Sequence, residues 1–124
     1  MPPYTTDHLP ALPCHLNGEL TTLDRARISP LDRGFIFGDG IYEGIAVYGR
    51  PGQAPQPFRF EQHMARLERG LAETRIANPH TRAEWRRIAL DLIAAHPDAA
   101  TVNDWFYYFQ VTRGVAPRDH VMPE

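Results

Sequence analysis

The sequence feature that most constrains the fold is a strand-like alternation that follows a glycine-rich turn within residues 31–48. Gly34, Gly38 and Gly40 lie among bulky residues, which predicts a tight turn with two bulky side chains anchored beneath it. From residue 41 onward the side chains alternate between two faces, which is the two-residue period of a β-strand. One face carries Ile41, Glu43, Ile45 and Val47, and the other carries Tyr42, Gly44, Ala46 and Tyr48. Because two of the neighbours of Tyr42 are small, we expect a concavity beside it if another layer covers that face.

The segments around this strand predict short elements joined by turns. Asn17-Gly18 between apolar flanks is a strong hairpin signal, with the second strand over residues 19–22. Residues 24–30 are a polar connection. The strand over 41–48 is expected to end at the turn of residues 49–52, and residues 53–57 are expected to prolong that loop.

Two helices and a last strand follow. Phe60, Met64, Leu67 and Leu71 recur at helical spacing and predict a helix over residues 60–74. Thr81 and Glu84 have the spacing of a capping box. The helix that follows has a buried stripe of Trp85, Ile88 and Leu92, and Pro97 limits its extension. Residues 105–112 are aromatic and β-branched on both faces, so we expect a strand covered on both sides, followed by an irregular segment.

The fold class predicted from this order is α+β, a mainly antiparallel sheet with two helices on one face. A length of 124 residues fits one domain. We assign residues 14–124 to it and treat residues 1–13 as an extended lead-in.

Charge and composition exclude several classes of partner. The net charge of −2 and the lack of a basic patch argue against nucleic acid and anionic membrane surfaces. No apolar stretch approaches the length of a membrane span. A single cysteine, Cys14, fits a reducing compartment, and the cytoplasm is the expected location.

All 13 basic residues are arginine, and the chain contains no lysine. Any mechanism that needs a lysine amine therefore requires a residue from outside this chain.

Several polar constellations are candidates for chemistry. Arg118 and His120 in the last segment offer donors suited to one carboxylate, although a solvated loop is the alternative. Arg66 stands one helical turn from His63 and is either a phosphate clamp or a surface arginine paired with a glutamate of its own helix, Glu61, Glu68 or Glu73. Tyr42 is a substrate ligand or a packed strand residue. The six histidines are scattered without the spacing of metal ligands, which argues against a zinc site.

Three stretches together resemble the N-terminal half of the fold-type IV, class IV pyridoxal-phosphate aminotransferases, and within that family the D-amino acid aminotransferases. They are LDRGFIFGDGIYEGIAVYGRP, FRFEQHMARLERGLAETRI and YYFQVTRGVAPRDHVMPE. The resemblance spans roughly residues 15–124 and favours the functional interpretation of each candidate above.

The resemblance implies a role for each candidate residue. Tyr42 matches a tyrosine that helps to bind the substrate carboxylate, and Arg66 matches the arginine that holds the phosphate of pyridoxal 5'-phosphate. Arg118 and His120 match the pair that recognises the α-carboxylate, reached from the neighbouring subunit of a homodimer. The implied substrates are a D-amino acid and a 2-oxo acid.

The Schiff-base lysine of this family lies on a C-terminal domain beyond residue 124. The expected protein is therefore an N-terminal domain without a catalytic residue of its own, unable to attach the cofactor covalently and inactive in isolation. Two alternatives remain open. One is a branched-chain aminotransferase or aminodeoxychorismate lyase relative, and the other is a non-catalytic fragment that acts only in association.

Overall fold

The computed structural model describes residues 8–123, so the first part of the expected lead-in, residues 1–7, and residue 124 lie outside the described residues. Eight elements follow one another along the chain. They are β1 (Pro13–Leu16), β2 (Glu19–Thr22), α1 (Arg33–Phe37), β3 (Gly40–Arg50), β4 (Gln53–Pro57), α2 (Phe60–Thr74), α3 (Arg82–Ala95) and β5 (Asp104–Thr112).

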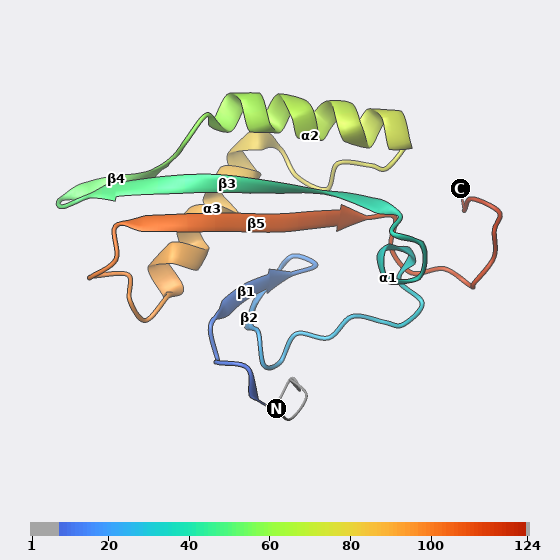
Figure 1. Ribbon diagram of the computed structural model, residues 1–124, viewed down its shortest axis with the longest axis horizontal. Coiled ribbons are helices and arrows are strands. Elements are labelled where there is room, and N and C mark those ends of the chain that lie inside the picture. Colours follow the sequence, from blue (N-terminus) through green and yellow to red (C-terminus); the bar gives the residue numbers. More distant parts are fainter. Residues whose placement is uncertain (1–7, 124) are drawn as a thin grey trace, which may run out of the picture.

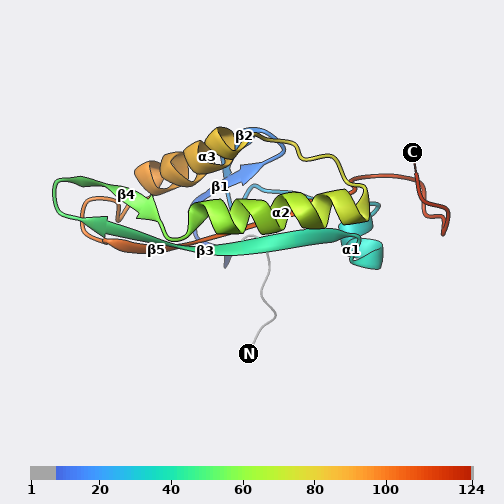
Figure 2. The same cartoon turned by 90° about the horizontal axis from the view of Figure 1, so that it is seen from above.

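The architecture is the α+β arrangement that the sequence predicts. β4, β3 and β5 form one sheet in that order, with antiparallel pairing throughout, and β1 and β2 form a separate hairpin. Figure 2 shows α2 and α3 on the same side of the three-stranded sheet, with the hairpin beside α3. None of the helices within residues 8–123 is long and apolar enough to cross a membrane.

The core lies between the sheet and the two long helices. The apolar stripe of α2, consisting of Phe60, Met64, Leu67 and Leu71, is buried, which confirms that helix and its face. From the strands, Ile45, Val47, Tyr107 and Val111 complete this core. Trp85 and Ala89 are buried on α3, whereas Ile88 and Leu92 are only partly buried against the core. The capping box is also confirmed, because Thr81 and Glu84 each accept a hydrogen bond from the other's backbone N–H.

The Asn17-Gly18 hairpin is confirmed as well. Leu16 pairs with Glu19, and both turn residues have positive φ, 49° at Asn17 and 90° at Gly18. This left-handed backbone is what a two-residue hairpin turn requires.

The prediction that β5 is covered on both sides is wrong for this chain. Its burial alternates, with Tyr107 and Val111 buried and Phe106 and Tyr108 exposed. Both long helices lie on one face of the sheet, and within the described residues no element covers the other face (Figure 2). The aromatic character of both faces is real, but only one of them belongs to the core.

The glycine-rich stretch before β3 also differs from its prediction. Residues 33–37 form the short helix α1 instead of a bare turn. Asp32 caps it by accepting a hydrogen bond from Gly34 N at 2.8 Å, and Gly38 ends it with φ 64°. Phe35 is not anchored beneath the turn, because it is 77% exposed.

Residues 53–57, expected to prolong a loop, form strand β4. Gly52 has φ 76° and reverses the chain, after which Tyr48 pairs with Gln56 and Arg50 with Gln53. Pro55 and Pro57 are tolerated because β4 is an edge strand, where a missing N–H costs no ladder bond. β3 correspondingly extends to Arg50, two residues beyond the predicted end.

Candidate functional site

A buried carboxylate joins β3 to α2. Glu43 is 3% exposed and accepts hydrogen bonds from Arg66 Nε at 2.7 Å and Arg66 Nη2 at 2.8 Å, a bidentate pair. The Nδ1 atom of His63 lies 2.8 Å from the second carboxylate oxygen. The sequence does not predict this partner. It predicts that Arg66 binds either a phosphate or a glutamate of its own helix.

The hydrogen bonds from Arg66 and His63 keep the Glu43 carboxylate ionised. Burial opposes ionisation, but the hydrogen bonds from Arg66 and His63 outweigh it and hold the pKa of Glu43 below its ordinary value. The hydrogen bonds that Arg66 donates to Glu43 raise the pKa of Arg66 in turn. The pair is therefore ionised at neutral pH.

Arg66 keeps donors for a ligand. A guanidinium has five N–H donors, and Glu43 uses Nε and one N–H of Nη2, so the two N–H groups of Nη1 and one of Nη2 remain. The Arg66 side chain is 62% exposed. The arrangement holds the guanidinium plane in place with its remaining donors directed away from Glu43.

Tyr42 points to the opposite, exposed face of the sheet. It is 68% exposed and packs on Tyr108 with ring centroids 5.7 Å apart. The expected concavity beside it is partly filled, because the Phe106 ring lies over Gly44 so closely that a Cβ there would come within 2.5 Å of it. A covering layer over this face is absent from the described residues.

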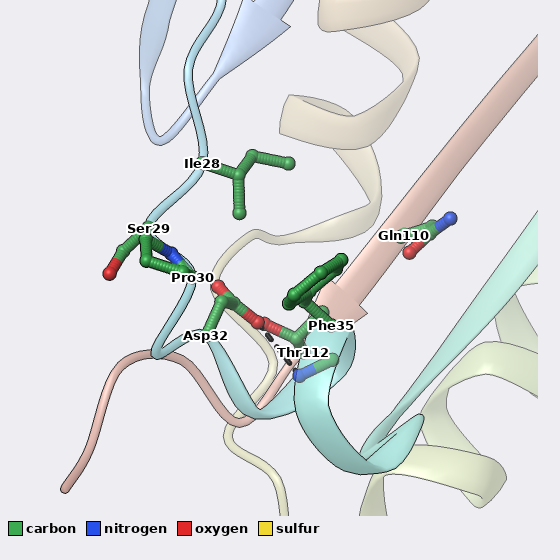
Figure 3. Close-up of a pocket in the computed structure, with 8 residues that line it drawn as sticks. Ile28, Ser29, Pro30, Asp32, Phe35, Gln110 and Thr112 are labelled. Carbon is green, nitrogen blue, oxygen red and sulfur yellow. Dashed lines mark hydrogen bonds between the residues drawn. The ribbon is translucent and has the colours of Figure 1, made fainter. Parts of the chain in front are cut away.

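A hollow on this face lies instead at the end of β5, beside α1. It has a volume of about 450 Å³ and is lined mainly by the segment before α1, with Phe35, Gln110 and Thr112 on its other side. Figure 3 shows Phe35 on α1 beside Gln110 and Thr112 of β5, with Ile28 and Pro30 across from them. Tyr42 does not line this hollow.

Arg118 and His120 lie together in the terminal loop. The guanidinium carbon of Arg118 is 5.8 Å from the centroid of the Phe37 ring, and the His120 ring centroid is 5.7 Å from the same ring. Within residues 8–123, neither side chain has a hydrogen bond or ion pair. Both sets of donors are therefore accessible to a ligand.

A second charged network anchors this end of the molecule. Asp39 accepts hydrogen bonds from Arg33 Nε at 2.8 Å, Arg113 Nε at 2.8 Å and Arg113 Nη2 at 3.1 Å. These bonds, that from Arg113 foremost, hold the pKa of Asp39 below its ordinary value. Arg113 also donates to the carbonyl oxygens of Thr74 and Arg75, which ties the end of α2 to the end of β5.

The structure brings the predicted residues together only in part. Arg118 and His120 share one aromatic surface, whereas Tyr42 points to the face of β3 opposite to Glu43, the partner of Arg66. Within the described residues no hydrogen bond or ring contact joins Tyr42 to Arg118 or His120.

Sequence reasoning missed Glu43, Asp39, Arg33 and Phe37 as parts of the site. A signal for Glu43 was available, because it is the one charged residue on a strand face otherwise composed of Ile41, Ile45 and Val47. A carboxylate on a buried face needs a cationic partner. No comparable signal marks Arg33 or Phe37. Among residues 8–123 no cluster of three or more histidine, cysteine, aspartate or glutamate side chains is arranged to hold a metal ion.

Comparisons with known proteins identify the family. Residues 40–124 match the model of amino-transferase class IV. A D-alanine aminotransferase of Listeria monocytogenes serotype 4b (strain F2365) is 34% identical over 110 residues, and one of Staphylococcus haemolyticus is 33% identical over 108 residues. The chain belongs to the class IV aminotransferase family.

Solved structures share the fold. The branched-chain amino acid aminotransferase of Escherichia coli superposes with a TM-score of 0.73 at 20% identity, over 86% of this chain and 34% of that one. A fold IV-transaminase from Curtobacterium pusillum superposes with a TM-score of 0.65 at 26% identity, over 78% of this chain and 32% of that one.

The matches cover nearly all of this chain and a minor part of its relatives. The two D-alanine aminotransferases are matched over 88% and 87% of this chain, but over only 35% of their own length. The chain thus spans about a third of the length of the curated relatives it matches.

Proposed function

We propose that this chain is the N-terminal part of a D-amino acid transaminase, which moves an amino group between a D-amino acid and a 2-oxo acid with pyridoxal 5'-phosphate. Residues 14–124 would form its N-terminal domain. The observation that carries the proposal is that Arg118 and His120 both lie against the ring of Phe37. Among the described residues, neither side chain donates a hydrogen bond to a protein acceptor. A planar fork of donors and a ring N–H at one place suit a carboxylate.

The donor set at Arg66 fits the phosphate of the cofactor. Glu43 fixes the guanidinium through two hydrogen bonds, and the remaining N–H groups give a rigid cation for a dianion. When bound, pyridoxal phosphate supplies an electron sink for the carbanion that forms as the substrate loses its α-proton. Arg66 would hold the phosphate, and Glu43 and His63 would keep Arg66 in position.

The substrate carboxylate would be bound by Arg118, His120 and Tyr42. A carboxylate fixed by several charge-assisted contacts cannot rotate freely, so the substrate's Cα–H bond keeps one orientation relative to the cofactor ring. Because no contact joins Tyr42 to the other two residues here, we propose that the site is completed across a homodimer. Arg118 and His120 of one subunit would then serve the site that contains Tyr42 of the other.

The lysine that binds the cofactor would be supplied by a C-terminal domain encoded beyond residue 124. The absence of lysine from this chain supports this part of the proposal, as does its coverage of about a third of its relatives. The isolated 124-residue protein is then inactive. We also propose that the protein acts in the cytoplasm, in keeping with its single cysteine.

Incubation with pyridoxal phosphate, followed by borohydride reduction and peptide mapping, tests the isolated chain. We expect no stable cofactor label other than on the α-amino group of Met1, the one aliphatic amine that the sequence contains. A label on any other residue, or turnover of D-alanine by this chain alone, would contradict the proposal. The downstream coding sequence provides a direct check, since a continuing frame should encode a lysine-bearing domain.

The same experiments separate the alternatives. A branched-chain aminotransferase would prefer L-leucine to D-alanine once the longer protein is assayed, and substitution of Arg118 would leave its Km values unchanged. An aminodeoxychorismate lyase would instead eliminate pyruvate from aminodeoxychorismate, leave the amino group on the ring, and need no 2-oxo acid acceptor. A non-catalytic fragment would lack a downstream lysine-bearing frame and would show only association, which light scattering detects.

A further inference from the structure

The terminal loop that carries Arg118 and His120 is paired at its start, over residues 114–116, with the segment that leads into α1. Arg33 N donates to Gly114 O at 2.8 Å, Asp32 forms a β-bridge with Val115, and Ala116 N donates to Leu31 O at 3.4 Å. Figure 1 shows this loop leaving β5 beside α1, at the end of the sheet far from the β3–β4 turn. The position of the loop therefore depends on α1.

Arg33 makes the contact nearest to the pair. Its side chain is 7% exposed, Nε donates to Asp39 at 2.8 Å, and Nη1 donates to the carbonyl oxygen of Asp119 at 3.0 Å. Asp119 is the residue between Arg118 and His120. One buried guanidinium thus connects a fixed carboxylate on one side to the middle of the RDH tripeptide on the other.

Phe37 makes the contact with the side chains themselves. Its ring lies 4.8 Å from the guanidinium carbon of Arg33, 5.8 Å from that of Arg118 and 5.7 Å from the ring centroid of His120. The ring face attracts cations, and a tilted aromatic pair is favourable at this separation. The ring limits the rotamers of two side chains that make no hydrogen bond, ion pair or other ring contact within residues 8–123.

We propose that Phe37 and Arg33 are positioning residues for the carboxylate-binding pair: Arg33 fixes the loop backbone at Asp119, and Phe37 holds the side chains of Arg118 and His120 side by side. This inference rests on the proposed function, because it assumes that the pair binds the substrate carboxylate. Neither residue touches substrate. Their contribution is to reduce the conformational freedom that the pair loses when a carboxylate binds.

The variants are chosen to separate positioning from folding. F37L keeps an apolar side chain but removes the ring, and F37Y restores the ring. R33K keeps a positive charge beside Asp39, but one ammonium cannot replace both the Nε and the Nη1 contacts. F35L is the matched control, because Phe35 belongs to the same short helix but lines the hollow beside Gln110 (Figure 3). The ring contacts of Arg118 and His120 within residues 8–123 are to Phe37 and not to Phe35.

The first measurement uses nuclear magnetic resonance on the 124-residue chain. Because Phe37 shifts the His120 ring protons by its ring current, F37L should move those resonances, and F37Y should leave them near the wild-type positions. R33K should speed exchange of the Val121 amide, whose N–H donates to Oδ1 of Asp119 at 3.2 Å. F35L should do neither.

The second measurement uses the longer protein of the proposed function. F37L and R33K should raise Km for D-alanine about tenfold with unchanged affinity for pyridoxal phosphate, and F37Y should restore Km. Unchanged His120 resonances in F37L would overturn the inference, as would an unchanged Km or a parallel loss of cofactor affinity. If R118A leaves Km for D-alanine unchanged, the proposed function fails instead, and the resonances alone decide whether Phe37 and Arg33 position the pair.

Discussion

Replacing Asp39 with asparagine should destabilise the fold by about 3 kcal/mol at neutral pH. The carboxylate accepts three hydrogen bonds from two guanidinium groups that are themselves 7% and 10% exposed. Asn can keep its oxygen at the position that accepts from Arg33 Nε and Arg113 Nε, but its NH₂ group then faces Arg113 Nη2. The hydrogen bond from Arg113 Nη2 is therefore lost, and the two bonds from Arg33 Nε and Arg113 Nε now go to a neutral amide oxygen instead of a carboxylate.

The magnitude follows from the strengths of these bonds. Hydrogen bonds to charged groups contribute about 1.5–3 kcal/mol and neutral ones about 0.5–1.5 kcal/mol, so one lost bond and two weakened bonds together cost about 3.5–6 kcal/mol. We take about 3 kcal/mol because Asp39 keeps some contact with water, its side chain being 15% exposed. Breaking a buried ion pair at one partner has costs of the same order, about 3–5 kcal/mol.

The pH dependence has a definite sign. The pKa of Asp39 is lower in the folded protein than in the unfolded chain, chiefly through the hydrogen bond from Arg113. Its contribution to stability is therefore fully present above the unfolded pKa of about 3.9 and is lost as the pH falls through the folded value. The difference between wild type and D39N should be largest at pH 7 and should shrink below about pH 4.

Urea unfolding followed by tryptophan fluorescence at pH 7, 5 and 3 measures this difference, with Trp85 buried against Phe109 as the reporter. D104N is the control, because Asp104 is exposed at the start of β5 and has no ion pair in residues 8–123. A D39N difference below about 0.5 kcal/mol at pH 7, or one that stays constant to pH 3, would refute the reasoning.

Three further substitutions test other parts of the structure. L67A should cost about 3 kcal/mol in urea unfolding, because Leu67 is 1% exposed in the core, whereas exposed Leu20 should tolerate alanine. Burial, and then the charge of His80, lower the pKa of His15, so wild type should lose stability as the pH falls below about 6.5, and H15N should lose less over the same range in urea midpoints. In the longer protein R66A should weaken pyridoxal phosphate binding at least tenfold by absorbance titration, and R69A, on the exposed side of the same helix, should not.

Local patterns in the sequence predict much of this fold. The four-three-four spacing from Phe60 to Leu71 is enough to place α2 and its buried face, because the helical period repeats over several turns. The Asn-Gly turn and the capping box likewise act within a few residues. Each of these features depends on neighbours along the chain.

The elements that were missed depend on contacts between distant segments or are too short for periodicity. β4 contains two prolines and becomes a strand only because β3 offers an edge with which it can pair. α1 has five residues, too few to show a helical repeat. The exposure of Phe106 could not be deduced from the composition of β5, since an aromatic residue suits both a core and a surface that another domain would cover.

The same division applies to the candidate site. Arg66, Arg118 and His120 are found from local motifs together with a family resemblance. Their supports are not, because Glu43 lies 23 residues before Arg66, and Arg33 lies 86 residues before Asp119. Only the tertiary fold brings these pairs together.

The most direct test of the central claim is the steady-state transamination of D-alanine by the longer protein, compared between wild type and R118A with 2-oxoglutarate as the amino acceptor. The account predicts turnover of D-alanine in preference to L-leucine, and a rise of at least tenfold in Km for D-alanine in R118A with unchanged cofactor affinity. A preference for L-leucine, or a Km for D-alanine that is the same in R118A as in wild type, would contradict it.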